Sequence, residues 1–173
     1  MMQTLSSQYT EQLQALRVLI VDDEAAMRHV TKSLLQVIGV KTIYEAADGK
    51  SGLDAICRWG PDIVILDRSM PSPNGPEFIR TVRQPGVFPY PAVPIIMLTA
   101  RGERSRVVEA VQLGVHEFLI KPVSSTALLA RVVSIISNPR RMVNKGGRYV
   151  PEPREMSSYK PETDPALSEV VLI

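Results

Sequence analysis

Five polar residues stand at the ends of short apolar runs in this 173-residue sequence, where their side chains could do chemistry together. They are Asp22, Asp23, Asp67, Thr99 and Lys121. Asp67 closes the run "DIVILD" and is followed at once by the chain-breaking "RSMPSPNG". An isolated aspartate there would most often cap the next turn. A charge at the mouth of a buried strand is costly, however, unless something pairs with it.

The five residue types together favour phosphoryl chemistry. Carboxylates gathered within a few ångströms repel one another, which requires raised pKa values or a bound cation. Mg²⁺ meets this need with a few carboxylates, water and phosphate oxygens. A lysine ammonium group and a threonine hydroxyl beside a carboxylate add the donors that a transferring phosphoryl group requires. A carboxylate in such a pocket can act as a nucleophile and become an acyl phosphate.

The elements that must position these residues follow from the hydrophobic pattern. Strands are predicted at 17–23, 41–47, 62–67, 94–100 and 117–122, and most of them are apolar on both faces, as in a covered parallel sheet. Helical spacing of apolar residues separates them, at 27–37, 50–59, 77–83, 103–113 and 126–137. This alternation predicts an α/β fold, a (βα)5 doubly wound five-stranded parallel sheet. Ligands of such sheets bind at the carboxyl ends of the strands, where the five polar residues would meet.

The pattern divides the chain into three parts. Residues 17–137 form the predicted domain. Residues 1–16 are an N-terminal extension in which Leu5, Tyr9, Leu13 and Leu16 could line one face of a short helix. Residues 138–173 hold five prolines and charges of both signs, so we expect a tail that is extended or partly disordered.

Composition excludes several classes of protein. The net charge of +2 is too small to argue for binding to nucleic acid or to a membrane surface. Cys57 is the only cysteine, so neither an internal disulfide nor a cysteine-based zinc site is expected. We find no apolar run long enough to span a bilayer and no secretory signal pattern, and we therefore expect a cytoplasmic protein.

With these motifs in order, the sequence resembles the receiver domain of bacterial two-component response regulators. The resemblance extends over about 120 residues, from "VLIVDDE" through "DIVILDRSMPSPNG" and "IIMLTA" to "FLIKP". Each motif alone is weak evidence, but together and at these spacings they are highly specific. The resemblance implies the flavodoxin-like, CheY-like arrangement of the predicted sheet.

The resemblance also implies a role for each site residue. Asp67 would be the phosphoacceptor, and Lys121 would pair with a phosphoryl oxygen. Asp22, Asp23, Asp67 and the backbone carbonyl of Ser69 would hold Mg²⁺, with Asp22 acting mainly through water. Thr99 and Phe118 would be the switch residues, and the Lys121–Pro122 peptide bond would be cis.

The sequence departs from the family pattern in three places. Asn74 stands before Gly75, where the family more often has aspartate, although Asn74 and Glu77 still form a plausible helix start. The segment 84–94, "QPGVFPYPAVP", is longer and richer in proline than usual, as in a specificity loop or, more simply, an insertion. Arg68 and Arg101 flank the site, and their effect on the lifetime of an acyl phosphate is open.

The main hypothesis is thus a stand-alone receiver, a signalling switch rather than an enzyme, which catalyses only its own phosphorylation and dephosphorylation. Its partners would be a histidine kinase or phosphotransfer protein, an unknown output protein, and a second copy bound through the 103–113, 117–122 and 126–137 face or the terminal extensions. The alternative is a Mg²⁺-dependent phosphohydrolase or phosphotransferase with an aspartyl nucleophile, but such enzymes often carry a second acid where this chain has Ser69. A DNA-binding regulator is disfavoured because no helix-turn-helix pattern follows residue 137.

Overall fold

A five-stranded parallel sheet forms the centre of the computed structural model, which describes residues 7–100 and 104–153, without the side chains of 104–106. The strand order is β2-β1-β3-β4-β5, as predicted for a doubly wound sheet. The strands are β1 (Arg17–Val21), β2 (Thr42–Ala46), β3 (Ile63–Asp67), β4 (Ile95–Thr99) and β5 (Glu117–Ile120).

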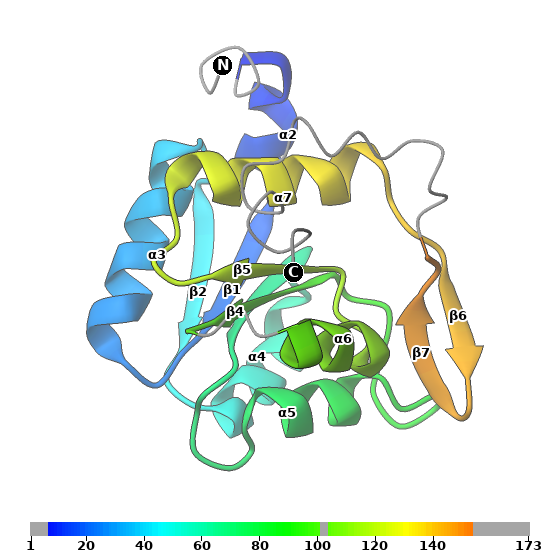
Figure 1. Cartoon of the computed structure of the whole chain (residues 1–173). Helices are drawn as coiled ribbons and strands as arrows, with labels where there is room; N and C mark the ends of the chain where they lie inside the picture. The colour runs from blue at the N-terminus through cyan, green and yellow to red at the C-terminus, as the bar shows by residue number, and fades with distance from the viewer. Residues whose placement is uncertain (1–6, 101–103, 154–173) are drawn as a thin grey trace.

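Helices cover both faces of this sheet (Figure 1). The helices are α2 (Thr10–Ala15), α3 (Ala25–Val37), α4 (Gly49–Trp59), α5 (Gly75–Val82), α6 (Arg104–Leu113) and α7 (Ser125–Ser137). One apolar core joins the sheet to α2, α3 and α7, and the other joins it to α4, α5 and α6. Because both faces are buried, β3 and β4 are buried at every position, which explains their continuously apolar sequences.

The helix that follows Asp67 begins as its sequence predicts. The side chain of Asn74 accepts a hydrogen bond from the Glu77 backbone N–H at 3.0 Å, and the Glu77 carboxylate accepts one from the Asn74 N–H at 2.8 Å. This reciprocal capping box satisfies two backbone donors at the start of α5. Asparagine in place of the family's aspartate therefore keeps the turn between the site and α5 intact.

The segment after α7 differs from the expected extended or partly disordered tail. Residues 142–151 form an antiparallel hairpin of β6 (Met142–Lys145) and β7 (Arg148–Pro151). Gly146 and Gly147 form its two-residue turn with φ angles of +60° and +77°, values that favour glycine and match a type I′ turn. The remainder of the predicted tail, 154–173, lies outside the described residues.

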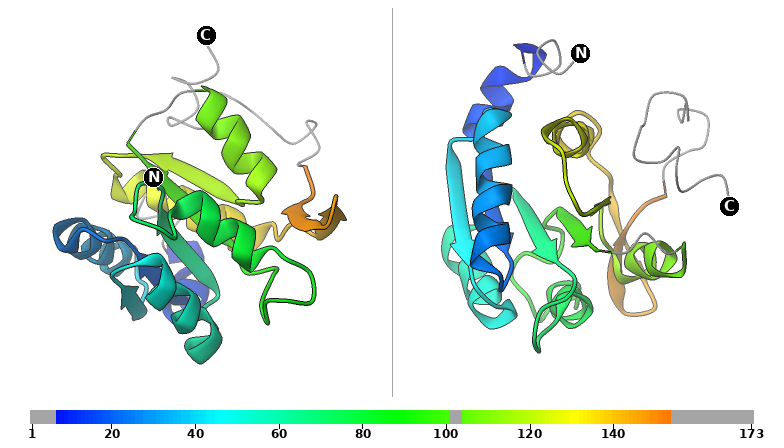
Figure 2. Two further views of the ribbon diagram at one scale, coloured as in Figure 1. Left: turned by 90° about the horizontal axis from the view of Figure 1, so that it is seen from below. Right: turned by 60° about the vertical axis from the view of Figure 1, so that its left-hand side comes forward.

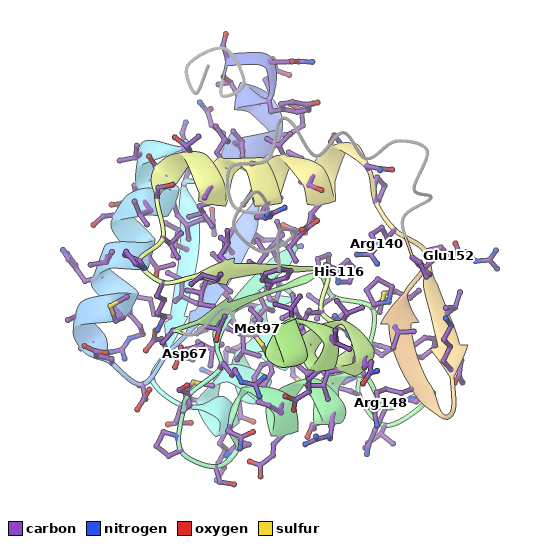
Figure 3. The ribbon with its side chains drawn as sticks, in the orientation of Figure 1. Asp67, Met97, His116, Arg140, Arg148 and Glu152 are labelled. Carbon is purple, nitrogen blue, oxygen red and sulfur yellow. The ribbon has the colours of Figure 1, made fainter. Side chains whose placement is uncertain are left out.

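The hairpin packs against the main domain beside α6, at the end of the sheet away from Asp67 (Figures 2 and 3). The Tyr149 backbone N–H donates to the Arg83 carbonyl at 3.0 Å, and Arg140 Nη1 donates to the His116 carbonyl at 3.0 Å. The Arg83 side chain is fully buried and donates to the carbonyls of Gly114 and Pro91. Burial lowers the pKa of Arg83 to about 9. These contacts join the hairpin to the 84–94 segment and to the start of β5.

None of the helices in the described part of the chain is both long and apolar enough to cross a membrane.

Candidate functional site

The site lies where β1, β3, β4 and β5 end, because parallel neighbours bring their carboxyl ends to one edge. Asp22 follows β1 directly, Asp67 and Thr99 are the last residues of β3 and β4, and Lys121 follows β5. Asp22, Asp67 and Thr99 are buried, whereas Asp23 is exposed. The structure therefore brings together all five polar residues that the sequence singled out.

Lys121 is the positive centre of this group. Its Nζ lies 2.8 Å from Asp67 Oδ1 and 3.4 Å from Asp22 Oδ2. Burial opposes the charged ammonium form, but the hydrogen bond and the attraction to Asp67 outweigh it, so the pKa of Lys121 is raised. The lysine is held as a cation against the phosphoacceptor candidate. The Lys121–Pro122 bond is cis, as the resemblance implied.

Asp22 is a carboxylate whose charged form is disfavoured in this group. Burial, with Asp67 as a like charge nearby, raises the pKa of Asp22 although Lys121 and a hydrogen bond from the Glu24 backbone N–H act in the opposite direction. Its backbone is fixed as well, because Arg28 Nη1 donates to the Asp22 carbonyl at 2.8 Å. A single ammonium group thus leaves negative charge that a further cation could neutralise.

The carboxylates have the spacing of a cation site. One oxygen from each of Asp22, Asp23 and Asp67 lies within 4.8 Å of the others, a set of hard oxygen donors suited to Mg²⁺. Ser69, which is exposed, donates its backbone N–H to Asp67 Oδ2 at 3.1 Å. This bond holds the loop after β3 close to the carboxylate. The donor chemistry and the raised pKa of Asp22 both fit a divalent cation.

Thr99 and Phe118, the candidate switch residues, line one small cavity. It has a volume of about 10 Å³ and is also lined by Arg68, Met97, Val107 and Ala110. Phe118 is paired with Met97 in the β4–β5 register and is partly buried against the core under α6. The cavity therefore lies between the end of β4, where the site is, and α6.

Arg68 lines this cavity, a position that the sequence could not indicate. Its Nη2 pairs with Glu109 Oε2 of α6 at 2.7 Å, and its side chain is 13% exposed. The partner is 41 residues away, so no local pattern signals the contact. Arg101, the other flanking arginine, lies outside the described residues.

His116 and Cys57, two residue types that often carry chemistry, lie outside this group. His116 is buried, and its Nδ1 lies 3.4 Å from Arg83 Nη2, far from the carboxylates (Figure 3). Cys57 is exposed on α4. Neither residue belongs to the site.

Known proteins match this chain over the same region. Residues 18–133 match the family model described as the response regulator receiver domain. The chemotaxis protein CheY of Pseudomonas aeruginosa is 32% identical over 120 residues, which are 69% of this chain and 95% of that protein. CheY-3 of Vibrio cholerae is 31% identical over 69% of this chain and 91% of its own.

This chain is also similar to a longer relative and to two solved structures. The probable transcriptional regulator ycf27 of Porphyridium aerugineum is 35% identical over 124 residues, but these are 49% of its length and 72% of this chain. The structure of CheY4 of Vibrio cholerae covers 68% of this chain and 95% of its own, with 32% identity and a TM-score of 0.61. The Francisella response regulator 1452 receiver domain covers 70% and 97%, with 25% identity and a TM-score of 0.64. With the matching strand order and the acidic edge of the sheet, these likenesses show that the chain belongs to the response regulator receiver family, and that this domain makes up most of it.

Proposed function

We propose that this protein is a phosphorylation-dependent signalling switch in which Asp67 accepts a phosphoryl group from a histidine kinase or phosphotransfer protein. The observation that carries the proposal is the Lys121 ammonium group 2.8 Å from Asp67 Oδ1, within a group of three carboxylates. A cation on one side of a buried carboxylate and an acidic group on the other form an environment for a metal-bound phosphoryl group. The proposed kinase partner implies a cytoplasmic location.

The chemical step is a phosphoryl transfer between two nucleophiles. An Asp67 carboxylate oxygen attacks phosphorus and forms the new O–P bond, while the P–N bond of the donor phosphohistidine breaks. The electron pair of that bond stays on the imidazole nitrogen, which can then take up a proton. Lys121 would balance charge on a phosphoryl oxygen during transfer.

Asp22, Asp23, Asp67 and the Ser69 carbonyl would hold Mg²⁺, which supplies positive charge to the phosphoryl oxygens. The exposed position of Asp23 and Ser69 leaves this side of the site open to solvent and to a donor protein. The buried Asp22 would act mainly through water, since it already accepts a hydrogen bond from Glu24 and lies near Lys121.

The output would be a change in the surface formed by α6, β5 and α7. Thr99 would turn toward the phosphoryl group, and Phe118 would follow it inward, because both line the same cavity. A local charge change of this kind can shift a two-state element. Val108 and Val111 of α6 are about half exposed, and they offer apolar area to an output protein or to a second copy of this chain.

The test is incorporation of a phosphoryl group from a small acyl phosphate donor, with the full chain and its Asp67→Asn variant compared with and without Mg²⁺. We expect about one acid-stable, base-labile phosphoryl group per wild-type chain with Mg²⁺, and none on the variant. Equal labelling of both proteins would refute Asp67 as the acceptor. Hydrolysis of a phosphate monoester, which is too weak a donor to phosphorylate a receiver, over many turnovers would instead support the phosphohydrolase.

A further inference from the structure

The side chain of Arg68 connects the residue after Asp67 to α6. Arg68 Nη2 lies 2.7 Å from Glu109 Oε2, and Glu109 stands on the turn of α6 that also carries Val107 and Ala110. The pair therefore bridges the end of β3 and a helix of the proposed output surface.

The guanidinium of Arg68 is not fully satisfied in this position. Its Nη1 is buried and has no hydrogen-bond partner in the described part of the chain. A buried, unpaired N–H group of a cation costs free energy, so this arrangement is easily displaced by a better acceptor. The nearest place where strong acceptors would arise is the neighbouring residue, Asp67, on its phosphorylation.

The cavity beside Arg68 limits what Phe118 can do. Its volume of about 10 Å³ is that of one water molecule at most, far less than a phenyl ring. Figure 3 shows Met97, which lines the cavity, between Asp67 and α6. Phe118 therefore needs more room to move inward than a turn of the small Thr99 side chain alone supplies, and Arg68 is the longest of the other side chains that line the cavity.

We propose that Arg68 is a positioning residue that exchanges partners when Asp67 is phosphorylated, which deepens and rests on the function proposed above. In the unphosphorylated protein its guanidinium holds Glu109 and fills the space behind Thr99. The phosphoryl group on Asp67 would carry about two negative charges in place of the single charge of the carboxylate, together with three strong acceptor oxygens. Arginine pairs with such oxygens through two parallel hydrogen bonds, so the guanidinium turns to them, releases Glu109 and opens the cavity for Phe118.

Five full-length proteins test this exchange: wild type, Glu109→Gln, Arg68→Leu, the double variant and Arg68→Lys. The readout is the lifetime of the acyl phosphate after the small donor is removed. In Glu109→Gln the guanidinium has lost its competing partner and shields the phosphoryl group from water, so we expect a lifetime at least threefold longer. Arg68→Leu shortens the lifetime, and in that background Glu109→Gln has no further effect. Arg68→Lys keeps the charge and restores part of the lifetime.

The matched control is Asp62→Asn, which breaks the exposed Arg17–Asp62 pair at the other end of the sheet and should keep the wild-type lifetime. Hydrogen exchange in 107–113 gives a second readout, with phosphorylation speeding exchange in the wild type but not in Arg68→Leu. An unchanged lifetime in Glu109→Gln, or an equal change with and without Arg68, overturns the exchange while leaving the proposed function standing. Failure of the wild type to be phosphorylated at Asp67 overturns both.

Discussion

At the scale of single residues, the site holds two carboxylates close together, and their burial and mutual repulsion lower the stability of the folded protein. Asp22 and Asp67 share one ammonium group, and Asp22 is almost fully buried. A folded protein that holds such a pair is less stable than one with a neutral residue in the same place, because the charged form has lost its hydration. A bound metal ion would neutralise part of this negative charge and so offset part of the lost stability.

The first prediction concerns Asp22→Asn in a metal-free buffer. The asparagine oxygen can still accept the Glu24 hydrogen bond, but the buried charge is gone. We expect the melting temperature to rise by a few degrees at neutral pH, since about 1 kcal/mol corresponds to about 2–4 °C in a chain of this size. Thermal unfolding followed by circular dichroism measures it.

The pH dependence of that difference has a definite sign. Burial raises the pKa of Asp22 in the folded state, so the penalty is present above that raised value. As the pH falls, the folded protein takes up the proton before the unfolded chain does. The advantage of Asp22→Asn should therefore shrink as the pH approaches the ordinary value of an aspartate, and a constant difference would contradict this origin.

At the scale of elements, the hairpin β6–β7 lies outside the family match, which ends at residue 133. It docks where Gly114 begins the turn into β5. Gly114 has a φ of +101°, and a Cβ atom there would lie 2.7 Å from the Tyr149 carbonyl oxygen. The close approach of β7 therefore needs glycine at this position.

The second prediction compares Gly114→Ala with Gly39→Ala. Gly39 has a similar φ of +106°, but its nearest neighbour, the Leu13 Cβ, would be at an ordinary 3.8 Å. The backbone strain of about 1–2 kcal/mol is common to both variants. In urea unfolding we expect Gly114→Ala to lose more stability than Gly39→Ala. Equal losses would mean that the hairpin does not press on this turn.

The elements also show what the sequence could and could not predict. The sequence predicted the five strands, the capping box at Asn74 and the meeting of the five polar residues. The hydrophobic pattern and the alternation of strands and helices are enough to place the carboxyl ends of parallel strands at one edge of the sheet. The hairpin was missed, although "VNKGGRYV" carries a recognisable signal of β-branched and aromatic residues around Gly-Gly. The Arg68–Glu109 pair and the buried Arg83 were out of reach, because they depend on packing between distant segments.

At the scale of the whole molecule, cation binding and stability should be linked. A ligand that binds only the folded state adds about 2.7 kcal/mol at a concentration 100 times its dissociation constant. We expect the melting temperature to rise with Mg²⁺ concentration, in a saturable way. The rise should vanish in Asp23→Asn, whose exposed carboxylate contributes to the site but not to the core.

The control is NaCl at matched ionic strength, which screens charges without occupying a site. If NaCl stabilises the protein as much as Mg²⁺ does, the three carboxylates do not form a cation site.

The central claim is that Asp67 is the residue that takes the phosphoryl group. The most direct measurement is peptide mapping by mass spectrometry after phosphorylation by a small donor with Mg²⁺ and reduction with borohydride, which converts an aspartyl phosphate to homoserine. We predict that the mass change falls on Asp67 alone and is absent in Asp67→Asn. A change on any other residue, or the same labelling in Asp67→Asn, would contradict the account.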